Sequence, residues 1–238
     1  MSHQTSPCLL LCMILAVSIG NTCARAVDKI DAIAFLEKYN YLHKSEGMIS
    51  TPATPEHINR AVMQFQEMYN IPITGELDKT TLDAMALPRC GHMDSEIAVN
   101  APANTPYVVL GSKWPKKRLT YKLAVPSSQF SAGKAKFFIK KAFAHWAKKT
   151  PLSFRKVETG GDIVVSFFKG NHGDGDPFDG KFGVLAHALG PKDGGATHFD
   201  DDEPWLLRGG GTGYINFQQV ATHEFGHALG LNHSRKQR

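Results

Sequence analysis

The chain has 238 residues, of which 42% are hydrophobic and 21% are charged, and its formal net charge is +5. This composition is typical of a soluble globular protein and excludes a chain built mainly of low-complexity or membrane-spanning sequence. The length allows one large domain or two small ones, each with its own core. A short basic run at 113–118 contains one aromatic residue, Trp114, and is better explained as a solvated turn than as a nucleic-acid patch, so nucleic acid is not an expected partner.

The N-terminus carries a targeting signal. Leu9 to Ile19 is an apolar run too short to cross a bilayer, and the small residues Ala24 and Ala26 follow it. We therefore expect residues 1–26 to be a signal peptide and the mature protein to be secreted into the extracellular space. A membrane anchor is the alternative for this run. No later segment is apolar enough to span a membrane.

Residues 27–87 show helical periodicity in three pieces. In the first, the predicted apolar stripe is Ile30, Ile33, Ala34 and Tyr41. In the second, the stripe is Ile58, Ala61, Val62, Phe65 and Met68, after Thr54 as N-cap and Pro55 at the first helical position. A third helix is predicted from Asp78 to Ala86. Three helices in about sixty residues predict a small bundle.

A single cysteine follows this bundle. Cys8, Cys12 and Cys23 lie in the expected signal peptide, so Cys90 remains alone in the mature chain. A lone thiol in an oxidising compartment indicates either intermolecular pairing or metal ligation. After it, residues 96–106 are rich in Ala, Pro and Asn and are predicted to be an exposed linker.

The remainder, residues 107–238, is predicted to be a second domain. Leu119 to Leu123 alternates as a strand, Ser131 is placed to cap a long helix through Lys149, and Ile163 to Phe168 is a continuous apolar run of strand length. We expect an α+β fold in which a mixed, mostly parallel twisted sheet packs on helices.

Residues 171–205 are rich in Gly, His and Asp. His172, Asp174, His187 and His198 offer three imidazoles and a carboxylate, enough for a closed tetrahedral zinc site with a structural role. The alternative is that these are ordinary polar side chains of a surface loop.

The last motif of the chain is His223-Glu224-Phe225-Gly226-His227-Ala228-Leu229-Gly230-Leu231-Asn232-His233. On a helix, His223 and His227 share one face and can bind one ion. Gly230 can adopt a left-handed conformation that ends the helix and returns His233 as a third ligand. Three histidines leave one position of a zinc ion open, which is typical of a catalytic site. An amphipathic helix with surface histidines would explain neither Gly230 nor His233.

This motif, and the longer stretch VATHEFGHALGLNHS, resembles the matrix metalloproteinases, which are zinc endopeptidases of the metzincin group. The resemblance implies a helical prodomain at 27–95, an activation linker at 96–106 and a catalytic domain at 107–238. It implies a latent enzyme that cleaves extracellular matrix proteins such as collagen, or other extracellular proteins. Its expected partners are such substrates, an activating protease and tissue inhibitors of metalloproteinases.

The segment Pro88-Arg89-Cys90-Gly91-His92-Met93-Asp94 resembles the cysteine switch of the same family, usually PRCGVPD. The resemblance implies that Cys90 ligates the catalytic zinc and that Arg89 pairs with Asp94. Met93 stands in place of the usual proline, and the loss of its fixed φ angle predicts a less tightly held loop.

The resemblance also implies a calcium site. Its ligands would be the side chains of Asp179, Asp200 and Glu203 and the backbone carbonyls of Gly180, Phe182 and Val184. Two further calcium candidates, at Asp162 and Asp201, are weaker because Ala196 and Gln129 stand where acidic partners are expected.

For the reaction, Glu224 is expected to act as general base, while Leu185 and Ala186 of an edge strand hold the substrate by backbone hydrogen bonds. The sequence stops at Arg238, before the Met-containing turn and the final helix that the family has. The alternative is therefore a truncated and inactive zinc-binding product that acts as a decoy.

Overall fold

The computed structural model describes residues 29–42, 53–94, 107–209 and 211–234. The predicted signal peptide at 1–26 and the whole of the predicted linker at 96–106 lie outside these ranges. The helices are α1 (Lys29–Lys38), α2 (Pro55–Met68), α3 (Lys79–Met85), α5 (Ala132–Ala147) and α6 (Phe217–Ala228). None of the helices in the described ranges combines the length and the apolar character that a bilayer crossing requires.

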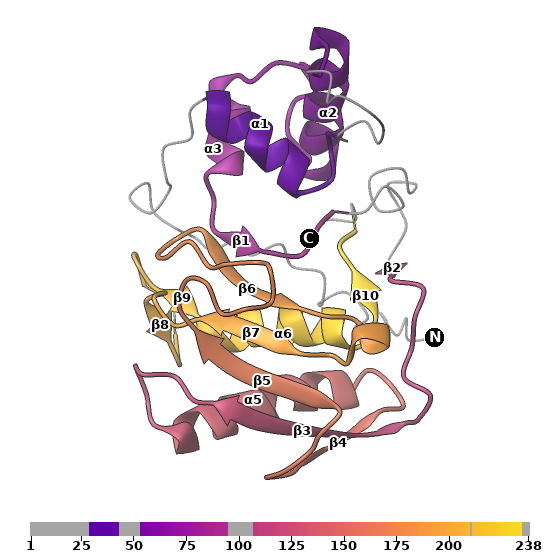
Figure 1. Ribbon diagram of the computed structural model, residues 1–238, viewed down its shortest axis with the longest axis vertical. Helices are drawn as coiled ribbons and strands as arrows, with labels where there is room; N and C mark the ends of the chain where they lie inside the picture. Colours follow the sequence, from indigo (N-terminus) through magenta and orange to yellow (C-terminus); the bar gives the residue numbers. More distant parts are fainter. Residues whose placement is uncertain (1–28, 43–52, 95–106, 210, 235–238) are drawn as a thin grey trace, which may run out of the picture.

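Helices α1, α2 and α3 form a small bundle that lies above the rest of the molecule (Figure 1). Thr54 caps α2 by accepting a hydrogen bond from the backbone N–H of His57, and Asp78 caps α3 through the N–H of Thr81, as polar caps at helix starts do. Phe65 of α2 is fully buried at the centre, with edge contacts to the rings of Phe35 and Tyr41. The predicted three-helix bundle is confirmed.

Of the stripe predicted for the first helix, Tyr41 is buried as expected, and the side chain of Ile30 lies outside the described residues. Helix α1 itself packs mainly through another face. Its buried residues are Ala32 and Leu36, followed by Tyr39, whereas Ala34 of the predicted stripe is exposed and Ile33 is only half-buried. Both sets have helical spacing, and the choice between them depends on which face meets α2, which the local sequence does not specify.

The larger unit is built on a six-stranded sheet of order β1-β6-β7-β5-β3-β4, in which the β6–β7 pair is antiparallel and the other pairs are parallel. Its strands are β1 (Arg89–Cys90), β3 (Arg118–Val125), β4 (Ser153–Lys156), β5 (Ile163–Phe168), β6 (Val184–Ala188) and β7 (Thr197–Asp200). Two strand pairs complete the fold: β2 (Val108–Val109) with β10 (Leu231–Asn232), and β8 (Trp205–Leu206) with β9 (Ile215–Asn216). The predicted α+β fold with a mixed, mostly parallel sheet is confirmed.

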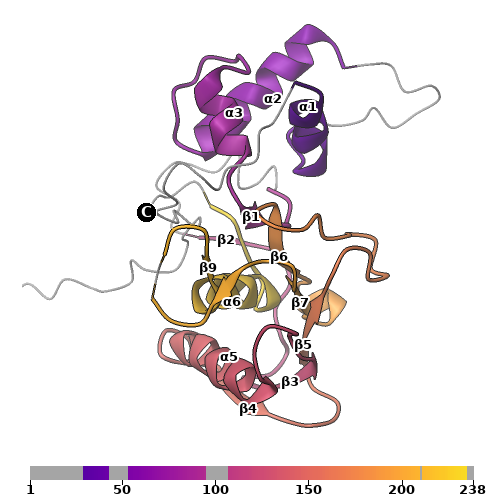
Figure 2. The ribbon, with the colours of Figure 1, turned by 90° about the vertical axis from the view of Figure 1, so that its left-hand side faces the viewer.

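Helices α5 and α6 pack against the sheet and against each other (Figure 2). The rings of Phe143 and Phe225 stack with their centroids 3.9 Å apart. Gly226 allows this approach, because a Cβ there would lie 2.9 Å from Trp146 Cζ2. Ser131 caps α5 as predicted, and the helix ends at Ala147, two residues before the predicted end. The core therefore positions α6, which carries the HExxH motif.

Candidate metal centre and active site

Helix α6 is fixed at both ends by polar contacts. Asn216 caps its start by accepting a hydrogen bond from the N–H of Gln219. Two indoles donate to its backbone carbonyls: Trp146 Nε1 to Thr222 at 2.9 Å and Trp114 Nε1 to Ala228 at 2.9 Å. The side chains that α6 presents are therefore held on a rigid support.

Three imidazoles converge at the end of α6. Gly230 has a φ of 101°, the left-handed conformation predicted for it, and the chain turns there into β10. The Nε2 atoms of His223 and His227 lie 3.1 Å apart, and that of His233 lies 3.2 Å and 3.1 Å from them. The structure thus brings together the three residues that the sequence predicts as ligands.

The donor set fits a zinc ion. His227 Nδ1 donates to the carbonyl of Leu231 at 2.8 Å, so the lone pair on its Nε2 faces the other two rings. Tetrahedral coordination at 2.0–2.1 Å places ligand nitrogens roughly 3.3–3.4 Å apart, close to the observed separations. Burial, and next the neighbouring His233, lower the pKa of His227 well below its ordinary value, which favours the neutral imidazole that a metal needs.

Cys90 belongs to the same cluster. Its sulfur and the three imidazoles offer ligand atoms that all lie within 4.8 Å of one another, and Cys90 is a buried free cysteine. The four donors would fill a tetrahedral metal site. Burial, and next the charge of Glu224, raise the pKa of the Cys90 thiol well above its ordinary value. A cation among these donors would oppose that shift, because it stabilises the thiolate.

Glu224 lies fully buried beside Cys90. Burial raises the pKa of its carboxyl to about 8. By distance and angle, neither carboxylate oxygen has a hydrogen-bond partner among the described residues, although the Cys90 thiol lies close enough to lower the pKa of this carboxyl in part. A buried carboxyl with both oxygens uncommitted is exceptional in folded proteins and is typical of a group that serves a reaction rather than the fold.

The switch segment, residues 88–94, enters the site as a strand. Its β1 pairs in parallel with β6, and the N–H of Gly91 donates to the carbonyl of Ala186 at 2.8 Å. A Cβ at Gly91 would lie 2.8 Å from Val184 Cγ1, so the close approach depends on glycine. Strand β6 carries Leu185 and Ala186, which were predicted to hold the substrate. It would be the edge strand of its own domain, but in this structure β1 pairs with that edge. Leu185 is fully buried below it.

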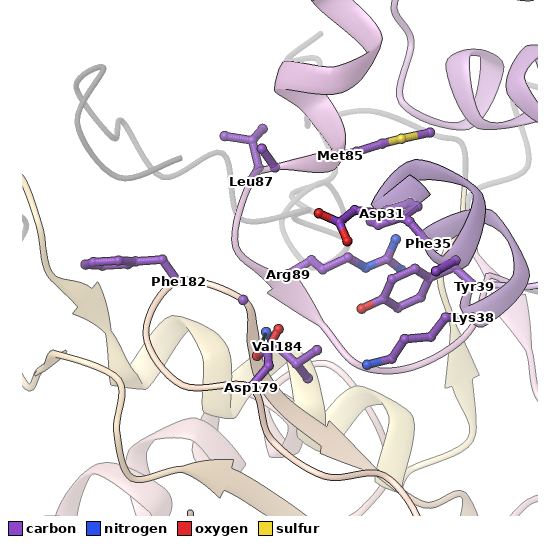
Figure 3. A pocket seen from close by; sticks show the side chains of 13 residues that line it. Asp31, Phe35, Lys38, Tyr39, Met85, Leu87, Arg89, Asp179, Phe182 and Val184 are labelled. Carbon is purple, nitrogen blue, oxygen red and sulfur yellow. Dashed lines mark hydrogen bonds between the residues drawn. The ribbon is translucent and has the colours of Figure 1, made fainter. Parts of the chain in front are cut away.

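Arg89 and Asp94 pair as the sequence resemblance implies, with Nη2 and Oδ2 3.0 Å apart. The guanidinium lies over the ring of Tyr39, 3.4 Å from its centroid, and beside Phe35 (Figure 3). A cavity of about 210 Å³ adjoins it where α1 meets the 179–184 loop. Although burial alone would raise the pKa of Asp94, Arg89 holds it well below its usual range. The pair anchors the switch segment to the helical bundle.

His92 was not predicted to have a role. The ring of His92 stacks on that of His227 with centroids 4.3 Å apart, and the backbone N–H of His92 donates to Cys90 Sγ at 3.3 Å. Arg89 Nη2 donates to its carbonyl at 3.3 Å. These contacts hold the turn in which Met93 replaces the expected proline. The sequence offered one signal, an aromatic ring at position 92 where the family motif has valine. The contact of this ring with His227 depends on the tertiary fold.

The second predicted cluster also assembles. Asp174 Oδ2 lies 2.8 Å from His172 Nε2, 2.8 Å from His187 Nε2 and 2.9 Å from His198 Nδ1. One carboxylate oxygen facing three imidazole nitrogens fits a metal cation with four protein ligands. Such a closed site is structural rather than catalytic. It joins the loop that carries Asp174 to β6 and β7.

The residues predicted for calcium gather more loosely. Asp179, Asp200 and Glu203 are not among the described groups whose ligand atoms all lie within 4.8 Å of one another. Two loop N–H groups bind them instead: Val184 donates to Asp179 Oδ1 at 2.7 Å, and Phe182 to Glu203 Oε1 at 2.7 Å.

A cation still fits this loop, because Glu203 Oε2 is buried with no partner in the described structure. Burial, together with the neighbouring carboxylates, raises the pKa of Glu203 to about 8 and that of Asp200 to about 6. A hard cation would relieve this repulsion. The backbone of Gly180 and Phe182 turns through left-handed φ angles of 84° and 64° beside these groups.

The two weaker calcium candidates are occupied by protein groups. Lys116 Nζ lies 2.8 Å from Asp162 Oδ1, so the ammonium of the protein already pairs with this carboxylate. Asp201 accepts hydrogen bonds from Ser127 Oγ and from the N–H of Ser128. Gln129 donates to the carbonyls of 201 and 203 at 2.8 Å and 2.7 Å.

Comparison with known proteins agrees with this geometry. Residues 113–238, more than half of the chain, match the matrixin family, peptidase M10. The chain belongs to the matrixins. Residues 34–85 of this matrixin, which include most of the helical bundle, match a family described as a putative peptidoglycan binding domain.

This matrixin has curated relatives of the same kind. It is 38% identical to human matrix metalloproteinase-16 over 84% of its own length and 35% of that protein's. It is 36% identical to human matrix metalloproteinase-15 over 94% of the chain and 36% of the relative. It is 34% identical to metalloendoproteinase 1-MMP of Arabidopsis thaliana over 85% of the chain and 59% of the relative. The chain therefore spans about a third to three fifths of these relatives.

Proposed function

We propose that this chain is a latent zinc endopeptidase that hydrolyses peptide bonds of extracellular proteins, including matrix proteins. The observation that carries the proposal is the group formed by His223, His227, His233 and Cys90, beside the uncommitted carboxylate of Glu224. Membership of a peptidase family supports it.

The imidazoles, strand β6 and Glu224 would each have a separate role in the reaction. A zinc ion held by the three imidazoles would supply Lewis-acid polarisation of the scissile carbonyl. Strand β6 would hold the substrate extended through the backbone of Leu185 and Ala186. Glu224 would take a proton from the attacking water as the new C–O bond forms. It would pass that proton to the amide nitrogen as the C–N bond breaks.

Latency would follow from two contacts of the switch segment. Cys90 would fill the metal position that the substrate carbonyl needs, and β1 would fill the edge of β6 that the substrate backbone needs. Activation would require both Cys90 and β1 to leave, through cleavage within the predicted linker at 96–106 by another protease or by the enzyme itself. Residues 27–95 would then be the inhibitory prodomain and residues 107–238 the catalytic domain.

Three further elements belong to the proposal. His172, Asp174, His187 and His198 would hold a structural zinc ion, supported by their convergence on one oxygen. Asp179, Asp200 and Glu203 would hold calcium, supported by the orphaned oxygen of Glu203. The leader at 1–26 would direct secretion, which would expose the active enzyme to tissue inhibitors of metalloproteinases.

The test compares zinc content and peptide cleavage after activation with a thiol-reactive mercurial. The wild-type chain should hold two zinc ions and cleave a quenched fluorescent peptide. Glu224→Gln should retain both ions and lose cleavage by orders of magnitude, whereas Glu158→Gln, an exposed carboxylate, should change neither. One zinc ion and no cleavage in the wild-type chain would instead support an inert zinc-binding product. Undiminished turnover by Glu224→Gln would refute the role given to that residue.

A further inference from the structure

Asp94 contacts more than Arg89. Its Oδ2 accepts hydrogen bonds from Arg89 Nη2 at 3.0 Å and from the hydroxyl of Tyr41 at 2.8 Å. Its other oxygen, Oδ1, lies 2.6 Å from Nδ1 of His233. The carboxylate is only 2% exposed, so water does not compete for these contacts. The switch segment therefore reaches the metal centre twice, with the sulfur of Cys90 and with the carboxylate of Asp94.

The geometry of His233 shows which partner donates the proton in this second contact. Its Nε2 faces the other two imidazoles, so the proton of the neutral ring is on Nδ1 and is donated to Asp94. Metal-binding histidines usually donate their second ring N–H to a carboxylate or a carbonyl, which fixes the ring orientation and strengthens the donor nitrogen. His227 obtains this partner from Leu231, within its own domain.

His233 also depends more on such a partner than the helical histidines do. It follows the left-handed turn at Gly230 and the two-residue strand β10, so α6 does not fix its ring. Asn232 Oδ1 accepts from the backbone N–H of His233 at 2.7 Å, which orients the chain but not the imidazole.

We propose that Asp94 is the outer-shell partner of His233, so that the switch segment, which blocks the catalytic metal, also holds the third histidine ligand of that metal in place. Asp94 is thus a positioning residue. The metal would be held most tightly in the latent form. Departure of the switch segment would remove both Cys90, a metal ligand, and Asp94, the support of another ligand. This inference rests on the proposed function, because it takes the three histidines as zinc ligands.

The test measures metal affinity rather than catalysis. The full chain is loaded with Co²⁺, and the thiolate-to-cobalt absorption of Cys90 is followed in competition with a chelator, with Cys90→Ser as the blank. Loss of an outer-shell partner weakens metal binding by about 10–100-fold, so this loss is expected for Asp94→Asn. Asp83→Asn, the same change at an exposed carboxylate paired with Lys79, should leave the affinity unchanged.

A double-mutant cycle separates this role from the pairing with Arg89. If Asp94 acts through His233, Asp94→Asn should weaken Co²⁺ binding in the wild-type chain but add nothing in the His233→Ala background. An equal loss in both backgrounds, or no loss in either, would overturn the inference and leave the proposed function standing. Absence of any Cys90–cobalt band in the wild-type chain would instead sink the proposed function.

A second measurement needs no substitution at Asp94. In the zinc-loaded wild-type chain with labelled imidazoles, the proton on His233 Nδ1 should give a protected, strongly downfield resonance, as a short hydrogen bond to a buried carboxylate does. Assignment comes from its disappearance in His233→Ala. A rapidly exchanging proton at that nitrogen would contradict the proposed contact.

Discussion

Gly230→Ala should damage the metal centre through the backbone. Gly230 has a φ of 101°, and placing an L-residue in the left-handed region costs about 1–2 kcal/mol. The added Cβ would also lie 2.5 Å from the backbone oxygen of Ser112. A backbone oxygen cannot rotate away, and overpacking of this kind costs about 1–3 kcal/mol. We therefore expect about 2–5 kcal/mol of destabilisation together with displacement of His233, three residues later.

Gly111→Ala is the matched control. Gly111 has a φ of 78°, but a Cβ there would meet nothing within 4 Å, so only the conformational cost of about 1–2 kcal/mol applies. Urea unfolding of the metal-loaded chains gives both free energies, and metal analysis gives the zinc content. Gly230→Ala should lower the free energy of unfolding by more than Gly111→Ala does. It should also lose one of the two zinc ions, whereas the control should keep both. Equal destabilisation of the two variants, with both ions retained, would refute the reasoning.

Three further predictions concern other parts of the molecule. Cys90→Ser should cleave peptide without mercurial treatment, although β1 can still pair with β6, because a hydroxyl is a far weaker zinc ligand than a thiolate and the switch segment then leaves the site more readily; cleavage no faster than by the untreated wild-type chain would argue against thiol inhibition. His187→Ala should lower the zinc content by one ion and lower the melting temperature, by calorimetry, while Cys90–cobalt absorption persists. Gln66→Met should destabilise the helical bundle by about 1–3 kcal/mol, because the buried N–H of Gly75 loses its acceptor; an unchanged urea midpoint would contradict this.

The sequence predicts an element well where its determinants are local. Thr54 caps α2 and Ser131 caps α5 because a short polar side chain there satisfies the first free N–H groups. The run from Ile163 to Phe168 forms β5 with its predicted ends. Gly230 adopts the predicted left-handed turn because only glycine reaches that conformation cheaply.

Prediction fails where the partner is distant in sequence. The buried face of α1 depends on contact with α2, and two stripes with helical spacing were available. Gln66 organises the segment 74–81, which leads into α3, through five hydrogen bonds that involve its side-chain amide, yet a glutamine inside a helix gives no such signal. The hydrogen bonds of Gln129 to the carbonyls of 201 and 203 follow from tertiary folding alone.

The candidate site divides in the same way. The two histidine clusters assemble as predicted because residue type and spacing restrict them strongly. The link between Asp94 and His233 spans 139 positions, and the family resemblance of the switch segment implies only the pairing of Asp94 with Arg89. The stack of His92 on His227 likewise depends on the register of β1 against β6.

If the proposed function holds, the contacts of Asp94 should make release of the switch segment an all-or-none event. Removing one member of a buried ion pair leaves an uncompensated charge, at about 3–5 kcal/mol, so Arg89 and Asp94 should separate only when both reach water. Tyr41 joins this pair to the helical bundle and His233 joins it to the metal centre. A change that loosens the helical bundle should therefore weaken both inhibition and metal retention. A change that loosens only the sheet should not weaken both at once.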